Sequence, residues 1–239
     1  IWTGMLVFSA IIFIGAAVAF QLLSDQGTTD WKDDQPSKEE EAKQKSRNAA
    51  AQQGLLILVN KQHPVEEDYK PDDLVAMSHY APDRSAAGRY MRAEAASAFN
   101  DLVEQAALDG YEIKMTTAYR SFGFQKMLYE GYVAKYSEEE ASKFSAKPGE
   151  SEHQTGLAVD VSSPSVDYQL TRAYGNEDEG KWLAVHAHEF GYILRYPDGK
   201  EGITGYMYEP WHLRYVGKFV AGEIYEQKTT LEEYLEQYM

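Results

Sequence analysis

The sequence predicts one α+β domain with a central antiparallel sheet flanked by helices. Segments with apolar residues at helical spacing are mixed with short apolar or alternating segments, without the regular strand–helix–strand repeat that builds a parallel sheet. The chain has 239 residues, 44% of them hydrophobic and 13% aromatic, which is enough for one well-cored domain and its appendages. It contains no cysteine, which excludes a disulfide framework and a thiol nucleophile.

Residues 1–23 are predicted to form a transmembrane anchor that precedes the domain. Residues 1–20 carry no charge and are mostly apolar, about the length that crosses a bilayer as a helix. A cleaved signal peptide is the alternative, because Ala17-Val18-Ala19 has the small-x-small pattern of a cleavage site. We favour the retained anchor, because the apolar run is longer than a signal core of about 7–15 residues. Both alternatives export the remainder of the chain.

Residues 24–53 are predicted to be a polar tether, partly helical after Pro36, because they have no apolar periodicity with which to build a core. Residues 54–239 are predicted to be the domain. The chain carries a net charge of −15, of which the domain holds −13, and no basic patch or basic helix stands out. Nucleic acid is therefore not an expected partner, and neither is an anionic lipid surface.

The first half of the domain is expected to contain two strands and one long helix. Residues 55–59 are continuously apolar, which predicts a buried strand, whereas the prolines in and after residues 61–81 predict a loop. Residues 92–108 have apolar side chains at helical spacing and are followed by Asp109-Gly110, a good helix stop. Residues 111–117 alternate as a strand does.

The second half begins with two helices, over residues 124–135 and 138–144. Val159 and Val161 then flank Asp160 as they would in a strand. The remaining elements are a helix closed by a glycine, a strand stopped by a proline, a further strand and two C-terminal helices: residues 181–190, 192–196, 212–215, 218–226 and 231–237.

Three side chains with the chemistry of metal ligands stand out in this framework. His153 and Asp160 lie in the stretch Ser151-Glu-His-Gln-Thr-Gly-Leu-Ala-Val-Asp, and His212 ends the later stretch Glu209-Pro-Trp-His. Three nitrogen and oxygen ligands leave one position of a tetrahedral zinc ion open, which is the arrangement of a catalytic site. A glutamate outside the ligand set, Glu209, can then act as the general base toward water.

The predicted elements can bring these residues together. On a strand, Ala158 and Asp160 share one face while the apolar neighbours point to the other. Gly156 allows a sharp bend that returns His153 toward Asp160. Pro210 indicates that the last strand starts only after it, so that Glu209 lies on the turn entering the strand.

These two stretches resemble the VanY/LdcB-type zinc carboxypeptidases, which share the hedgehog/D,D-peptidase zinc fold with the VanX-type dipeptidases. The likeness extends over roughly residues 54–234 and includes Tyr119-Arg-Ser-Phe122. It implies one zinc ion on His153, Asp160 and His212, with Glu209 as base toward water and then acid toward the leaving amine. It also implies that the substrate is the peptidoglycan stem peptide, from which the C-terminal D-alanine is removed.

The resemblance assigns further residues. Arg120 matches the family arginine that stabilises the oxyanion, and a structural salt bridge is the alternative. Gln125 and Ser151 are expected to hydrogen-bond substrate, unless they only cap or satisfy backbone. His186 and His188 are expected to be ordinary helix histidines, because on a helix they point in different directions.

The exact reaction stays open between two alternatives. D,D-cleavage of a pentapeptide is slightly favoured, and L,D-cleavage of a tetrapeptide is the alternative. A non-catalytic peptidoglycan-binding module is disfavoured because the three predicted metal ligands and Glu209 are all present. A penicillin-binding enzyme is disfavoured because no Ser-x-x-Lys motif occurs in the sequence. We expect a monomer held at the cell membrane by a single span, with the catalytic domain facing the cell wall.

Overall fold

The computed structural model describes residues 36–82 and 88–239. The chain divides into two compact units, Ile1–Glu41 and Ala42–Met239. Of the first unit only residues 36–41 are described, and they include the start of helix α2 (Lys38–Gln52). The predicted anchor at residues 1–23 lies outside the described residues. Within the described ranges, no helix combines the length and the apolar character needed to cross a membrane.

The second unit is built around a four-stranded antiparallel sheet with the order β3-β4-β6-β5. A two-stranded antiparallel pair, β1 with β2, lies beside the start of α3. The strands in chain order are β1 (Leu74–Ala76), β2 (Tyr90–Arg92), β3 (Lys114–Thr117), β4 (Ala158–Ser162), β5 (Tyr192–Leu194) and β6 (His212–Tyr215). The α+β class and the central antiparallel sheet are therefore confirmed.

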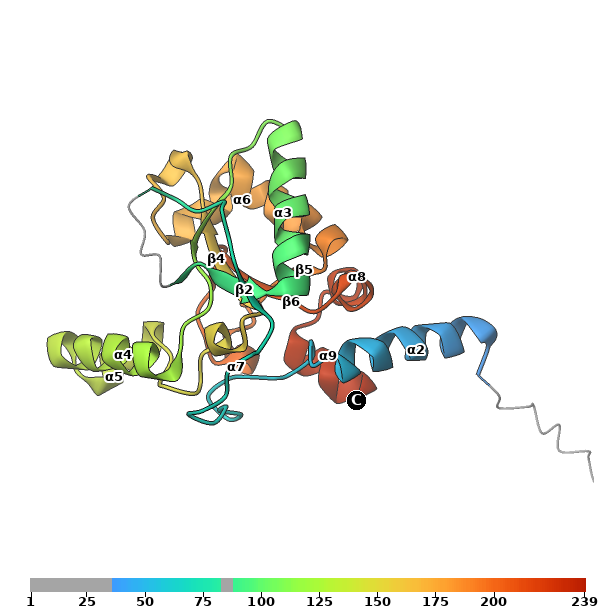
Figure 1. Cartoon of the computed structure of the whole chain (residues 1–239), viewed down its shortest axis with the longest axis horizontal. Coiled ribbons are helices and arrows are strands. Elements are labelled where there is room, and N and C mark those ends of the chain that lie inside the picture. Colours follow the sequence, from blue (N-terminus) through green and yellow to red (C-terminus); the bar gives the residue numbers. More distant parts are fainter. Residues whose placement is uncertain (1–35, 83–87) are drawn as a thin grey trace, which may run out of the picture. The chain divides into compact units, whose positions relative to one another are not determined.

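Helices flank this sheet, and α4 and α5 pack against each other as a pair that stands apart from α3 and α6 (Figure 1). The α-helices are α3 (Ala93–Leu108), α4 (Phe122–Tyr136), α5 (Glu138–Phe144), α6 (Asp178–His186), α7 (Glu201–Thr204), α8 (Lys218–Gln227) and α9 (Leu231–Tyr238). Short 3-10 helices connect them: η2 (Glu152–Thr155), η3 (Pro164–Val166), η4 (Arg172–Asn176) and η5 (Ala187–Phe190).

One predicted strand is wrong. Residues 55–59 are buried over most of their length as expected, but they form a turn followed by irregular backbone. Arg214 Nη2 donates hydrogen bonds to the carbonyl oxygens of Leu55 (2.9 Å) and Ile57 (2.8 Å). A buried side chain thus takes the place of a neighbouring strand in satisfying this backbone.

Other boundaries shift by smaller amounts. The strand expected over residues 111–117 begins only at Lys114. The helix expected over residues 181–190 begins earlier, at Asp178, and its end is the 3-10 helix η5, which stops at Gly191 with φ of 86°. Positive φ at this position suits glycine, as the sequence indicated.

The polar segment before the domain contributes to its packing. Helix α2 buries Arg47 and Ala50, and the compact unit begins at Ala42, ahead of the boundary predicted at residue 54. Arg47 donates two hydrogen bonds to Glu223 of α8, at 3.0 and 2.6 Å, and its guanidinium lies 4.0 Å from the ring centre of Tyr238. The contacts of Arg47 and the packing of Ala50 and Ala51 anchor a helix that has little apolar surface.

The two faces of the sheet differ in character, and this difference positions the site. Val159 and Val161 of β4 and Leu213 of β6 join the hydrophobic core, which α3 covers with Phe99 and its neighbours. Residues at the alternate positions, such as Asp160 and His212, therefore project from the opposite face. The predicted division of β4 into an apolar and a polar face is confirmed.

Candidate active site

Asp160 and His212 face each other because of the strand register. Asp160 of β4 is the direct partner of His212 of β6 in the antiparallel ladder, and directly paired residues point to the same side of a sheet. Asp160 Oδ1 lies 2.8 Å from His212 Nδ1. Both side chains are buried.

His153 reaches the same point from η2. The 3-10 helix ends at Gly156 with φ of 68°, where a Cβ atom would come within 2.8 Å of Leu74 Cδ2. The bend predicted for Gly156 is thus present, and it directs the chain back into β4. His153 Nδ1 donates to the carbonyl oxygen of Ala118 at 2.6 Å, which turns Nε2 toward Asp160 Oδ2 at 3.2 Å.

The three side chains fit a metal ion. One ligand atom from each of His153, Asp160 and His212 lies within 4.8 Å of the others. Imidazole nitrogen and carboxylate oxygen are common zinc ligands, and in a tetrahedral site with bonds of about 2.0–2.1 Å the donor atoms are about 3.3 Å apart. His153 Nε2 is buried and accepts no hydrogen bond from any described residue, so its lone pair is available to an ion.

Protonation of the two imidazoles differs. Burial and the charge of Arg120 lower the pKa of His153 to about 4, so this ring is neutral at pH 7. Burial alone would also lower the pKa of His212, but its interactions with Asp160 and Glu152 raise that pKa to about 9. In the metal-free protein His212 therefore holds a proton that an ion must displace.

Glu209 lies beside the three ligands and is not one of them. Its carbonyl oxygen accepts a hydrogen bond from the His212 backbone N–H at 3.1 Å, which closes the turn predicted before β6. Its carboxylate Oε2 is 3.9 Å from His212 Nδ1. Burial raises the pKa of Glu209 to about 7, the range in which a carboxyl group can both accept and return a proton near neutral pH.

Arg120 supplies a cation to the same cavity. Its backbone N–H donates to the His153 carbonyl oxygen at 3.1 Å, which places the residue directly beside the metal ligand. Burial lowers the pKa of the guanidinium, while the negative charges of Asp160 and Glu209 raise it. A guanidinium keeps its charge in proteins, so it can stabilise a developing negative charge here.

Gln125 and Ser151 also line this cavity, and both are buried. The Gln125 side-chain Nε2 donates to the Ala146 carbonyl oxygen at 2.7 Å, while its Oε1 has no hydrogen-bond partner among the residues described. The Ser151 hydroxyl makes no capping hydrogen bond to η2, although it precedes that helix. Each therefore keeps a polar atom that can meet a substrate.

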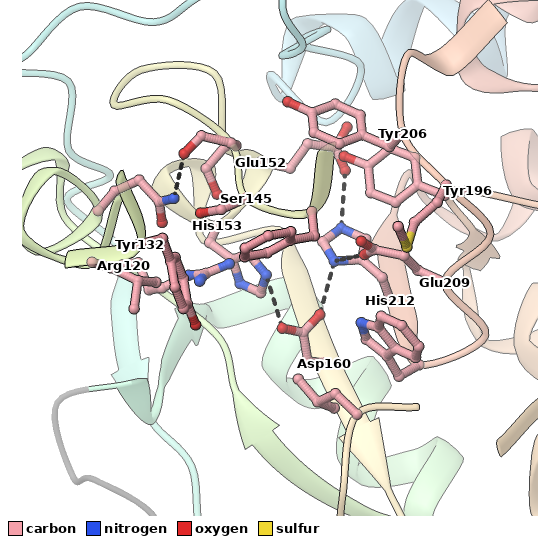
Figure 2. A pocket seen from close by; sticks show the side chains of 18 of the residues that line it. Arg120, Tyr132, Ser145, Glu152, His153, Asp160, Tyr196, Tyr206, Glu209 and His212 are labelled. Atoms are coloured by element: carbon pink, nitrogen blue, oxygen red, sulfur yellow. Dashed lines mark hydrogen bonds and ion pairs between the residues drawn. The ribbon is translucent and has the colours of Figure 1, made fainter. Parts of the chain in front are cut away.

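All seven residues predicted for the site line one cavity of about 510 Å³, shown in Figure 2. Its outer walls come from α4, from the segment that leads into η4 and from the turn before Glu209. The wall residues that the sequence did not single out include Tyr132, Phe144, Leu170, Thr171, Arg172 and Tyr196. Trp211 both packs against the core and lines the cavity.

One buried carboxylate at the site was not predicted. Glu152 is the first residue of η2, and its Oε1 accepts hydrogen bonds from Arg195 Nε and Arg214 Nη1, each at 2.7 Å. Burial would raise the pKa of Glu152, but the two guanidinium groups hold it well below its usual range. Its place next to His153 in the sequence was the only signal, because the arginines come from distant parts of the chain.

His186 and His188 lie away from this cavity and have different partners. His186 Nδ1 is 3.1 Å from Glu189 Oε1, and the His188 ring stacks on Tyr225 with a centroid distance of 3.8 Å. Their different surroundings agree with their expected different directions on the helix.

Known proteins are similar to this chain in amino-acid sequence. A family model described as VanY: D-alanyl-D-alanine carboxypeptidase matches residues 88–218, a range that contains every predicted site residue. A D-alanyl-D-alanine carboxypeptidase of Enterococcus faecium is 35% identical over 190 residues, which are 77% of this chain and 58% of that protein. The chain thus spans less than two thirds of this relative's length.

Known structures share the fold as well. The structure of the LdcB LD-carboxypeptidase matches with a TM-score of 0.73 and 44% identity, covering 76% of this chain and 86% of that one. A mutant of the vancomycin-resistance D,D-pentapeptidase VanY, in complex with Zn(II), matches with a TM-score of 0.64 and 34% identity, covering 76% and 98%. Sequence and structure agree, and the chain belongs to the VanY D-alanyl-D-alanine carboxypeptidase family.

Proposed function

We propose that this protein is a zinc carboxypeptidase that removes the C-terminal D-alanine from peptidoglycan stem peptides. The observation that carries the proposal is the buried set of His153, Asp160 and His212 with Glu209 beside it, in a cavity large enough for a peptide end. VanY, solved in complex with Zn(II), supports zinc as the ion.

Zinc held by His153, Asp160 and His212 would supply Lewis-acid polarisation and activate water for attack. Glu209 takes a proton from the attacking water and passes it to the nitrogen of the leaving D-alanine. Its pKa near 7 suits both steps, because the group must accept the proton first and release it afterwards. Arg120 stabilises the negative charge that develops on the carbonyl oxygen of the cleaved bond.

For the cleaved bond we propose L,D-specificity, so that a tetrapeptide is trimmed to a tripeptide. The residue attacked is then the L-centre of a diamino acid, whose long polar side chain needs a roomy pocket with polar groups. Leu170 to Arg172 and Tyr206 with Met207 line parts of a cavity of about 510 Å³ that also contains Arg120 and Gln125. The 44% identity to LdcB, named as an LD-carboxypeptidase, supports the same assignment.

D,D-cleavage is the second candidate, and it is the one that the sequence slightly favoured. The family description and the VanY D,D-pentapeptidase structure support it. In D,D-cleavage the attacked residue is a D-alanine, whose side chain is only a methyl group. A cavity of about 510 Å³ is larger than that side chain needs, which disfavours the D,D candidate.

Synthetic tetrapeptide and pentapeptide stems, incubated with the zinc-loaded protein and read by mass spectrometry, separate the two candidates. We expect tripeptide and free D-alanine from the tetrapeptide and an intact pentapeptide. Trimming of the pentapeptide alone would support the D,D candidate. No release from either peptide, with zinc bound, would reject the proposed function.

We also propose that the domain works outside the cell membrane, tethered by residues 1–23. The basis is the uncharged apolar character of that segment and the location of peptidoglycan. Fractionation of cells that produce the full-length protein tests this, and release of the domain into the medium would favour the cleaved alternative.

A further inference from the structure

We propose that Glu152 is a positioning residue for the metal ligand His212, holding its Nε2–H so that Nδ1 faces the metal ion. The inference rests on the zinc site of the proposed function. It concerns a carboxylate that takes no part in the proposed bond cleavage itself.

The two oxygen atoms of Glu152 have different surroundings. Oε1 accepts hydrogen bonds from Arg195 and Arg214. Oε2 lies 3.5 Å from His212 Nε2. Glu152 Oε2 and His212 Nε2 are both buried, and neither atom has a hydrogen-bond partner elsewhere in residues 36–82 and 88–239. Buried polar atoms without partners are rare in folded proteins, so the pair calls for an explanation.

Asp160 and Glu152 contact the His212 ring from opposite sides (Figure 2). Asp160 Oδ1 is 2.8 Å from Nδ1 in the metal-free site, which is shorter than the separation of about 3.3 Å between two donors of a tetrahedral zinc ion. An ion between Asp160 and His212 would therefore push the ring away from Asp160. A movement of the ring in that direction would shorten the distance from Nε2 to Glu152 Oε2, now 3.5 Å, toward that of an ordinary hydrogen bond.

The hydrogen bond also selects the tautomer. A neutral imidazole carries one N–H, and a carboxylate can only accept, so a proton on Nε2 leaves the lone pair on Nδ1 for the metal ion. Glu152 is suited to this role because its side chain is fully buried and the two arginines fix Oε1 in place. The arrangement parallels that of His153, whose Nδ1–H is held by the Ala118 carbonyl oxygen.

Glu152→Gln tests the inference directly. Arg195 and Arg214 would donate their hydrogen bonds to the oxygen of the new amide, so that its NH₂ group faces His212 Nε2. An NH₂ group can only donate, so it favours the tautomer with the proton on Nδ1. That tautomer has no lone pair on Nδ1 for the metal ion. We expect the zinc dissociation constant, measured by competition with a chelator, to rise about 10–100-fold. Circular dichroism and thermal melting establish that the variant is folded.

Glu232→Gln is the matched control. Glu232 accepts hydrogen bonds from Arg195 at 2.8 and 2.6 Å, so it belongs to the same ion-pair cluster without touching His212. We expect this variant to lose stability and keep its zinc affinity. If both variants lose zinc affinity equally, Glu152 acts only through the arginine cluster and the proposal is wrong.

The wild-type protein offers a second test that does not depend on whether a variant folds. In the zinc-loaded protein, long-range ¹H–¹⁵N NMR spectra should place the remaining His212 proton on Nε2 and the metal on Nδ1. Metal coordination through Nε2 would overturn the inference. A wild-type protein that binds no zinc would instead reject the proposed function, so the two failures are distinguishable.

Discussion

At the scale of single residues, the candidate metal ligands and the proposed general base occupy separate positions in the site. His153, Asp160 and His212 hold their ligand atoms within 4.8 Å of each other, while the Glu209 carboxylate lies 3.9 Å from His212 Nδ1. Burial acts differently on the two kinds of group. It keeps His153 neutral for the ion, and it brings the pKa of Glu209 to about 7 for catalysis.

Glu209→Gln should therefore abolish turnover and retain zinc. The amide keeps the shape of the side chain but cannot accept a proton, and general acid–base catalysis of this kind contributes about 10²–10⁴-fold to the rate. Zinc content by atomic emission and hydrolysis of the stem peptide are measured on the same preparation. Loss of zinc in proportion to activity would identify Glu209 as a ligand and contradict this assignment.

Zinc binding should depend on pH through His212. Its pKa of about 9 in the metal-free protein means that the ion displaces one proton from this ring at lower pH. The apparent zinc affinity should rise about tenfold per pH unit from pH 7 to 9 and level off above the pKa of His212. His153, with a pKa of about 4, is already neutral in this range and adds nothing to the slope. Affinity that stays flat between pH 7 and 9, after correction for the chelator, would exclude a protonated His212.

At the scale of elements, an antiparallel ladder, a 3-10 helix and a turn meet to build the site. Register places Asp160 opposite His212, and Gly156 at the end of η2 returns the chain toward them. Helix α2 has a different task, since it adds to the packing of α8 and α9 from a segment that is polar in sequence.

Arg47→Ala should loosen this helix from the unit. Arg47 is 2% exposed, and its removal takes the paired guanidinium from the partly buried Glu223 and the cation from the ring of Tyr238. We expect a loss of about 2–3 kcal/mol in the free energy of unfolding by urea denaturation. Lys45→Ala, an exposed position on the same helix, is the control and should change stability by less than about 0.5 kcal/mol. Equal effects of the two variants would show that α2 is not anchored through Arg47.

At the scale of the whole molecule, the core and the metal site use opposite faces of one sheet. The core contains apolar residues from every strand of that sheet and from α3, α8 and α9. None of the three candidate metal ligands belongs to it. Metal is therefore expected to support catalysis more than folding.

Removal of zinc by a chelator should leave the protein folded. We expect unchanged far-ultraviolet circular dichroism and cooperative unfolding, with a lower melting temperature because ligand binding to the native state no longer contributes. Activity should vanish and return on addition of zinc. Metal-free protein with the spectrum of an unfolded chain would contradict the separation of core from site.

Much of this architecture follows from local patterns. Helical spacing in residues 92–108 and the short strand after Pro210 depend on neighbouring residues only, so both could be predicted within about a residue. Likewise the residue types at 153, 160, 209 and 212 by themselves limit the chemistry to a metal and a base.

Tertiary structure decided what depends on distant partners. Residues 55–59 do not form a strand, because the side chain of Arg214 donates hydrogen bonds to the carbonyl oxygens of Leu55 and Ile57, which a neighbouring strand would otherwise satisfy. The role inferred for Glu152 likewise depends on Arg195 and Arg214, brought to it by β5, β6 and the loops around them. Sequence alone determined which groups could react and where local elements begin, because both are properties of neighbouring residues. The folded chain decided which buried charges meet, because pairing across the sheet is set by register and packing.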